Sequence, residues 1–81
     1  MSTITVYSAD WCGYCRMVKN YFDSKDIEYT EKNVEHDANF AKEAVEKSGQ
    51  MGIPVVDMDG TIIVGFDKAT IDHKLKDLKL A

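Results

Sequence analysis

Several features are scarce in this sequence, and each scarcity argues against a class of protein. Lysine and arginine together number 10 against 14 aspartates and glutamates, which gives a net charge of −4. A general nucleic-acid-binding surface must be basic to contact phosphates, so we expect no nucleic-acid partner. The longest apolar stretches, such as residues 62–64, fall far short of the roughly 20 residues that cross a bilayer. The first residues form no basic and apolar signal segment, so we expect a cytoplasmic protein without a membrane partner.

Cysteine is equally scarce. Cys12 and Cys15 are the only two cysteines, whereas a disulfide framework needs four or more. Loop-closure entropy grows with the logarithm of loop length, so a bridge between residues three apart stabilises the fold little. Zinc usually takes four protein ligands, and only His36 and His73 are left to complete such a set. We expect both histidines to be solvated and the cysteine pair to be redox-active, with a metal shared between two chains as the alternative.

Length and composition predict one small domain. A chain of 81 residues is too short for a second hydrophobic core, and 44% apolar with 30% charged residues is typical of a folded globular protein. The sequence has no internal repeat, low-complexity tract or linker. We therefore predict a single domain over residues 1–81.

The first third of the chain predicts a strand followed by a helix. Residues 3–7 are β-branched or aromatic, which is typical of a strand. From residue 13 the apolar side chains recur every three or four positions until about residue 25, which indicates a helix. Cys12 therefore lies at the junction between the strand and the helix.

The middle of the chain predicts a second strand and a second helix. The strand is expected over residues 27–34, where apolar and charged residues are mixed. Asp37 is a suitable N-cap, and Gly49 is a suitable end for the helix that follows. Spacing predicts that this helix buries four apolar side chains, those of Phe40, Ala41, Ala44 and Val45.

The last third predicts a hairpin and a third helix. Asp59-Gly60 fits a two-residue type I′ turn between strands 55–58 and 61–64. Asp67 can cap a last helix that turns three side chains inward, those of Ile71, Leu75 and Leu78. The order β-α-β-α-β-β-α predicts an α/β protein whose mixed sheet pairs the first two strands in parallel and the last two antiparallel.

The two cysteines are predicted to have different roles. Unpaired amides and the helix dipole favour negative charge at a helix N-terminus, so the Cys12 thiol should lose its proton readily. Cys15 lies one turn into the helix, near its apolar stripe, and should be more buried and less acidic. We assign Cys12 as the exposed nucleophile that forms a mixed disulfide with the substrate, and Cys15 as the thiol that resolves it.

Charges near Cys12 act in opposite directions. Arg16 and Lys19 should lower its pKa, whereas Asp10 should raise it. Our hypothesis is that Cys12 is largely thiolate near neutral pH.

Residues around the cysteines could contact substrate. Trp11 and Tyr14 are aromatics beside a nucleophile, and we expect them to be partly exposed and to touch substrate. A glycine such as Gly13 is more often present for the backbone conformation that it allows than for contact with a substrate. For Pro54, the only proline, base rates alone predict a trans bond.

Three short motifs resemble the glutaredoxin-like branch of the thioredoxin superfamily: Cys12-Gly13-Tyr14-Cys15 after the first strand, Ile53-Pro54 before the hairpin, and Gly65-Phe66-Asp67 before the last helix. The resemblance covers almost the whole chain. It implies a thioredoxin-like fold in which three helices flank a four-stranded mixed sheet. It also implies a cis bond between Ile53 and Pro54, against the base rate, and pairing of the substrate backbone with Ile53.

The resemblance also implies which residues bind substrate: Trp11, Gly13, Tyr14, Ile53, Pro54, Gly65, Phe66 and Asp67. Many glutaredoxins carry a lysine three residues before the nucleophile that contacts the glycyl carboxylate of glutathione, and this chain has Ala9 there. Asp67 and the adjacent helix N-terminus suit the γ-glutamyl end of glutathione. Losing one charge-assisted contact costs about 1.5–3 kcal/mol, so we expect weak use of glutathione.

We expect a monomeric dithiol oxidoreductase that reduces protein disulfides, glutathione mixed disulfides or both, with no tightly bound cofactor. Its electron source would be glutathione or a thioredoxin-type reductase. One alternative is a redoxin that supplies electrons to ribonucleotide reductase. Another is a dimer holding an iron–sulfur cluster with Cys12 of each chain and two glutathiones, because Gly13 removes the bulk of a proline. A third is an inert interaction module, in which Cys12 has no role.

Overall fold

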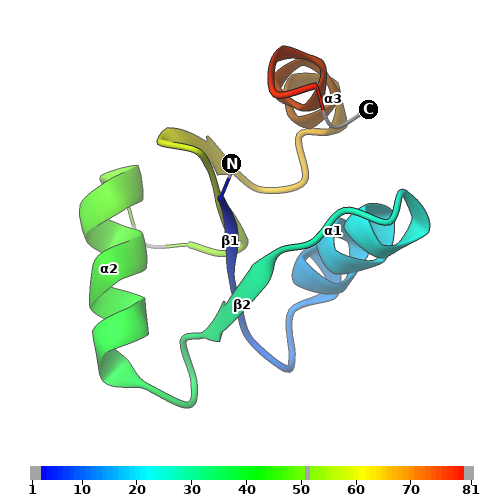
Figure 1. Ribbon diagram of the computed structural model, residues 1–81. Coiled ribbons are helices and arrows are strands. Elements are labelled where there is room, and N and C mark those ends of the chain that lie inside the picture. Colours follow the sequence, from blue (N-terminus) through cyan, green and yellow to red (C-terminus); the bar gives the residue numbers. More distant parts are fainter. Residues whose placement is uncertain (1–2, 51, 80–81) are drawn as a thin grey trace.

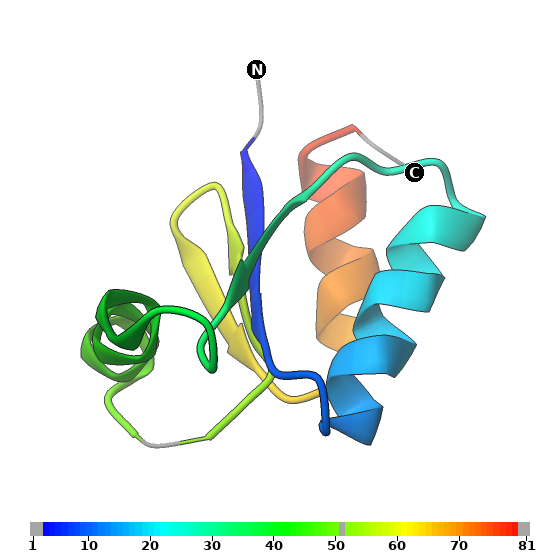
Figure 2. The same ribbon diagram turned by 90° about the horizontal axis from the view of Figure 1, so that it is seen from below.

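A four-stranded sheet lies between helices in the computed structural model, which describes residues 3–50 and 52–79. One helix covers one face of the sheet, and two helices cover the other (Figures 1 and 2). The elements are β1 (Ile4–Ser8), α1 (Gly13–Ser24), β2 (Thr30–Asn33), α2 (Ala38–Ser48), β3 (Val55–Met58), β4 (Thr61–Val64) and α3 (Lys68–Asp77). The predicted order and α/β class are confirmed. No helix in the described ranges is long and apolar enough to cross a membrane.

The sheet is mixed, as predicted, with strand order β2-β1-β3-β4. β1 runs parallel to β2, with Thr5 opposite Thr30, and antiparallel to β3, with Val6 opposite Val56. A parallel pair needs a long crossover, which α1 supplies, whereas β3 and β4 need only a tight turn. Because β1 is central and ends at Ser8, it leads the chain directly from the middle of the sheet into the cysteine loop.

The turn between β3 and β4 is the predicted two-residue turn. Asp59 and Gly60 have φ angles of 55° and 97°, and a type I′ turn requires positive φ at both positions. The Gly60 amide also donates a hydrogen bond of 2.9 Å to the Asp57 carboxylate. Local sequence chemistry therefore determines the register of this hairpin.

The two faces of the sheet are packed differently. The face under α1 and α3 carries the main core, in which β1 contributes Ile4 and Val6 and the helices contribute side chains such as Phe22 and Ile71. The face under α2 has a much smaller buried cluster of Tyr7, Ala44 and Val55. The buried apolar side chains are therefore concentrated on the face of the sheet that α1 and α3 cover. Figure 2 shows these two helices together on one side of the sheet and α2 on the other.

The second strand is shorter than the sequence predicts. The prediction covers residues 27–34, but β2 spans only Thr30–Asn33. Asp26 has a φ of 56° and turns the chain after α1, and Ile27 then enters the main core instead of a strand. The strand begins where the chain comes alongside Thr5 of β1, because β1 is its partner in the sheet.

The prediction of a four-residue apolar face on α2 is wrong. Ala44 alone is fully buried on this helix, Phe40 and Ala41 are half-buried, and Val45 is 38% exposed. The helix lies beside Tyr7 and Val55 over a small area, so its other apolar side chains face outward or toward a groove. Helical periodicity reports which residues share a side of the helix, but not how much of that side is covered.

Charged groups supplement the small apolar contact of α2. The buried Tyr7 hydroxyl donates to the Glu43 carboxylate at 3.0 Å, and the Lys32 ammonium donates to the same oxygen at 2.9 Å. Lys47 pairs with Asp57 at 2.6 Å, and both lysines lie within 5.8 Å of the centre of the Tyr7 ring. Attachment of α2 to the sheet therefore depends partly on ionised carboxylates.

We predict that this attachment weakens in acid. The hydrogen bond from Lys32, and then that from Tyr7, hold the pKa of Glu43 below its ordinary value. A carboxylate whose pKa is lowered on folding stabilises the protein above its unfolded pKa of about 4.3, and this contribution is lost as pH falls through the folded pKa. Glu43→Gln should lower the Tm at pH 7 by roughly 2–4 °C and flatten the decline of Tm between about pH 5 and 3.

Thermal unfolding followed by circular dichroism across this pH range measures the effect. Glu46→Gln is the matched control, because Glu46 lies on the same helix and its ion pair with Lys42 is long, at 4.0 Å. The control should retain the Tm and the pH profile of the parent protein. Identical profiles for the two variants would contradict the assignment.

Candidate active site

Cys12 is the N-cap of α1. Its backbone is extended, with φ −86° and ψ 112°, and its Sγ accepts a hydrogen bond of 3.1 Å from the Cys15 amide. An N-cap side chain satisfies an amide that has no partner inside the helix, and here sulfur takes the place of the usual oxygen. The helix start and the reactive sulfur are therefore joined by one interaction.

The two cysteines form a disulfide, with their Cα atoms 5.3 Å apart. Cys15 is fully buried, and Cys12 is only 6% exposed. The expectation of an openly exposed Cys12 is thus wrong in degree, because Ala9, Val34 and Ile53 pack around the pair. The asymmetry itself is present, since solvent reaches Cys12 and not Cys15.

The N-cap position is the physical basis for our hypothesis that Cys12 is largely thiolate. In the reduced protein, the same amide can donate to the thiolate, and the positive end of the helix dipole acts in the same direction. This local effect depends on a few backbone atoms at the helix start.

The nearby cations differ in how far their charge is neutralised. Lys19 donates to the Glu31 carboxylate at 2.6 Å, and the buried Ser8 hydroxyl donates to the same oxygen at 2.6 Å. Bonds from Lys19 and Ser8 hold the pKa of Glu31 below its ordinary value, so Glu31 is ionised near neutral pH. No salt bridge joins Arg16 to another residue in the described part of the chain. Arg16 is therefore the uncompensated cation in the first turns of α1.

The cysteine loop is tied to the connection between β2 and α2. The Asp10 amide donates to Glu35 at 2.7 Å, and the Asn33 side-chain amide donates to the Asp10 carboxylate at 2.8 Å. His36 lies 3.4 Å from the other Asp10 oxygen and is exposed, as expected. Sequence reasoning missed Asn33, which ends β2, and Glu35, which follows it, although the carboxyl end of β2 lies beside that of β1.

The aromatic residues of the motif are exposed, as predicted. Trp11 is 72% and Tyr14 is 65% exposed. A Cβ atom placed on Gly13 would meet nothing within 4 Å, so no tight packing requires a glycine at this position. The surface around Cys12 is therefore open and partly aromatic.

The Ile53–Pro54 bond is cis, as the resemblance implies. Pro54 is buried, and Ile53 packs against the cysteines. The Gly65 amide donates to the Pro54 carbonyl at 2.8 Å, which brings Gly65 beside the proline. These residues, far apart in sequence, meet the cysteine loop at one end of the sheet.

Two other predicted substrate residues also have structural contacts, of which the sequence predicted the Asp67 cap but not the packing of Phe66. Phe66 packs edge-on against Tyr21, with ring centres 5.8 Å apart, at the margin of the main core. Phe66 therefore has a packing role at the edge of the core. The Asp67 carboxylate caps α3 by accepting from the amide of Thr70 at 3.3 Å and from its hydroxyl at 2.8 Å.

An apolar hollow lies beside the cysteines on the α2 side. Its volume is about 240 Å³, and it is lined by Trp11, Val34, Ala41, Ala44, Val45, Gly52 and Ile53. Sequence reasoning found Trp11 and Ile53, but missed the wall formed by α2. The signal for this wall in the sequence was the set of apolar side chains that recur along α2.

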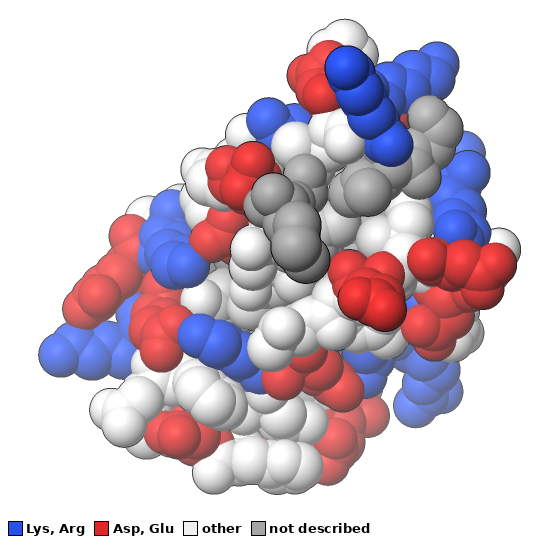
Figure 3. Space-filling model, in the orientation of Figure 1, with Lys and Arg blue, Asp and Glu red and all other residues white. Residues whose placement is uncertain are grey.

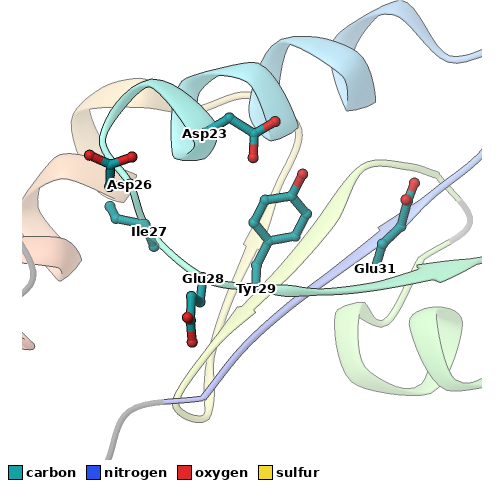
Figure 4. A pocket seen from close by; sticks show the side chains of 6 residues that line it. All are labelled: Asp23, Asp26, Ile27, Glu28, Tyr29 and Glu31. Atoms are coloured by element: carbon teal, nitrogen blue, oxygen red, sulfur yellow. The ribbon is translucent and has the colours of Figure 1, made fainter.

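A larger open hollow of about 820 Å³ lies at the other end of α1 from the cysteines (Figure 4). Its lining is acidic and includes Asp23, Asp26 and Glu28 around Tyr29. Burial, followed by the charge of Asp23 and that of Glu31, raises the pKa of Tyr29. Neither cysteine lines this hollow, so its size does not connect it with the disulfide.

The fold and the site together define a class. A mixed sheet whose first helix starts at a Cys-Gly-Tyr-Cys pair, beside a cis-proline, characterises thiol–disulfide oxidoreductases of the thioredoxin superfamily. The glutaredoxin family profile matches residues 4–63. The chain belongs to the glutaredoxin family.

Comparison with individual proteins agrees with this assignment. The chain is 44% identical to an uncharacterized glutaredoxin-like 8.6 kDa protein in the rubredoxin operon of Clostridium pasteurianum, over 90% of this chain and 97% of that protein. It is 32% identical to the glutaredoxin-like protein NrdH of Lactococcus lactis, over 78% of this chain and 86% of that protein. The thioredoxin-like protein BC3987 has a similar crystal structure, with a TM-score of 0.84 and 26% identity, over 90% and 100% of the two chains.

We predict that Arg16 and Glu31 change the pKa of Cys12 in opposite directions. Arg16→Gln removes the uncompensated cation and should raise this pKa by about half a unit. Glu31→Gln releases the charge of Lys19 and should lower it by a similar amount. Titration of the reduced protein by thiolate absorbance measures both shifts.

The double variant Lys19→Gln/Glu31→Gln is the control, because it removes a neutral pair and should leave the pKa of Cys12 near that of the parent. The parent pKa itself should lie below the ordinary cysteine value of about 8.5. Shifts of the same sign in Arg16→Gln and Glu31→Gln would refute the assignment.

Proposed function

We propose that this protein reduces protein disulfides by dithiol exchange through Cys12 and Cys15. The observation that carries the proposal is the hydrogen bond from the Cys15 amide to Cys12 Sγ at a helix N-terminus, with Cys15 fully buried behind it. This arrangement supports a thiolate at the accessible sulfur and protects the second sulfur until it is needed.

The reaction balances in two steps. The Cys12 thiolate attacks one sulfur of the substrate disulfide, a mixed disulfide forms, and the other substrate sulfur leaves as a thiolate that takes a proton. Cys15 then loses its proton and attacks Cys12 Sγ, which releases the second substrate thiol and leaves the Cys12–Cys15 disulfide. Two electrons pass from the protein to the substrate, and an external reductant must return them.

Tyr14, Trp11, Ile53 and Pro54 are the proposed contacts of the substrate. Trp11 and Tyr14 are exposed, and Ile53 packs against the cysteines. Pro54 is itself buried and is joined to Ile53 by the cis bond. Gly65 is a weaker contact that could reach a ligand beside Pro54, because its amide is bonded to the Pro54 carbonyl. Phe66 and Asp67 have roles in packing and capping, which weakens their assignment to a ligand.

We infer that a thioredoxin-type reductase, not glutathione, supplies the electrons. Glutathione carries two carboxylates. In many glutaredoxins a lysine at the position of Ala9 contacts the glycyl carboxylate. Ala9 is buried and uncharged, and both Asp67 carboxylate oxygens are engaged at the α3 cap. The likeness to the protein called NrdH supports a redoxin role, for which ribonucleotide reductase is a candidate target.

We predict that insulin disulfides are reduced at least tenfold faster with NADPH and thioredoxin reductase than with glutathione and its reductase. A missing charge-assisted contact weakens glutathione binding by one to two decades. NADPH consumption measures both rates. Cys12→Ser should abolish turnover, whereas Cys15→Ser should stop after a mixed disulfide that mass spectrometry detects.

Efficient turnover with glutathione and none with the reductase would overturn the inferred electron source. Retention of insulin reduction by Cys12→Ser would overturn the proposed function itself. Glu28→Gln, a change in the distant acidic hollow, is the control and should keep the parent rates.

A further inference from the structure

The hollow on the α2 side is a groove beside the disulfide. We call it the α2 groove; its lining is Trp11, Val34, Ala41, Ala44, Val45, Gly52 and Ile53. Val34 and Ile53 belong both to this lining and to the cluster around the cysteines. A segment that is covalently joined to Cys12 can therefore extend directly into the groove.

The groove is lined without a charged side chain. Trp11 and Val45 leave much of their apolar surface exposed there, at 72% and 38%. A partner side chain that covered them would remove apolar surface from water, which is favourable at about 25 cal/mol per Å². A volume of about 240 Å³ is suited to a side chain and not to a folded domain.

Two carboxylates flank one end of the groove. Asp10 precedes Trp11 and Glu35 follows Val34, and the Asp10 amide donates to Glu35 at 2.7 Å, so both carboxylates are held at this end. Asn33 fixes both residues, because it donates to Asp10 at 2.8 Å and accepts from the Glu35 amide at 2.9 Å.

Few positive groups oppose these carboxylates. His36, 3.4 Å from Asp10, is exposed and is a cation only when protonated. On α2, the described cations Lys42 and Lys47 pair with Glu46 and Asp57. On β2, Lys32 pairs with Glu43. Figure 3 shows acidic side chains among uncharged ones at the lower end of the molecule, where the cysteine loop and the β2–α2 connection lie. This end of the groove is therefore negative.

We propose that the α2 groove docks an extended segment of a protein disulfide substrate that carries an apolar side chain and a lysine or arginine close to its reactive cysteine. The apolar side chain fills the groove, and the cation lies against Asp10 and Glu35. This proposal rests on the proposed function and names its substrate class. Glutathione suits this groove poorly, because it has no apolar side chain and its two carboxylates outweigh its single ammonium group.

Three blocked pentapeptides test the proposal: Lys-Leu-Cys-Leu-Lys, Glu-Leu-Cys-Leu-Glu and Lys-Ser-Cys-Ser-Lys. Their symmetry presents the same groups whichever way the chain runs. Each cysteine is activated as a mixed disulfide with 5-thio-2-nitrobenzoate. In the Cys15→Ser variant, the Cys12 thiolate attacks the peptide sulfur, the Cys12–peptide disulfide forms, and coloured thionitrobenzoate leaves with the electron pair of the broken bond.

The rate of thionitrobenzoate release, divided by that with free 2-mercaptoethanol, measures recognition. We expect the lysine peptide to react about tenfold faster than the glutamate peptide at low ionic strength, with a smaller ratio at 0.5 M salt. We expect the leucine peptide to react several-fold faster than the serine peptide. Val45→Ser should reduce the second ratio and leave the first unchanged.

Paired variants in the Cys15→Ser background locate the charge effect. Asp10→Asn/Glu35→Gln should remove most of the preference for lysine. Asp26→Asn/Glu28→Gln removes the same two charges from the distant acidic hollow (Figure 4) and should preserve it. Because each ratio compares two peptides with one nucleophile, a change in the pKa of Cys12 does not affect it.

Several results would overturn docking in the groove. Equal rates for leucine and serine peptides would do so, as would an equal loss of the lysine preference in both double-charge variants. A different failure would overturn the proposed function: release no faster with Cys15→Ser than with Cys12→Ser/Cys15→Ser shows that Cys12 is not a nucleophile.

Discussion

The structure of this site depends on one hydrogen bond, from the Cys15 amide to Cys12 Sγ. It starts α1, because an N-cap must satisfy an amide that has no helical partner. It also places the Cys12 sulfur at a helix N-terminus, where unpaired amides and the helix dipole favour negative charge. The end of β1, the buried Ala9 and the cis Ile53–Pro54 segment all converge on this point. The central strand β1 and the packed face of α1 thereby fix the positions of the two cysteine sulfur atoms.

The two faces of the sheet contribute differently to the protein. Most of the apolar core lies under α1 and α3, where it supports the helix that carries the cysteines. α2 has one fully buried side chain and is held partly by the Tyr7, Lys32 and Glu43 network. Because most apolar side chains of α2 are not buried in the core, Ala41 and Val45 form part of the wall of a groove next to the disulfide.

Local patterns in the sequence predicted much of the fold and part of the site. The Asp59-Gly60 turn, the caps at Asp37 and Asp67, and the position of Cys12 depend on neighbouring residues, and the structure has them as expected. Predictions failed where a distant partner decides the outcome. Ile27 enters the core instead of a strand, and Val45 lines a groove instead of being buried.

The sequence by itself determined the order of elements and the placement of a cysteine pair at a strand-to-helix junction, since turn chemistry, capping and periodicity act over a few residues. The tertiary structure decided which charges and surfaces surround that pair. Lys19 is compensated by Glu31, twelve residues away, and Asp10 is held by Asn33 and Glu35. Such contacts depend on the register of β1 against β2 and on the packing of α2. Neither the register nor the packing can be read from the spacing of residues along the chain.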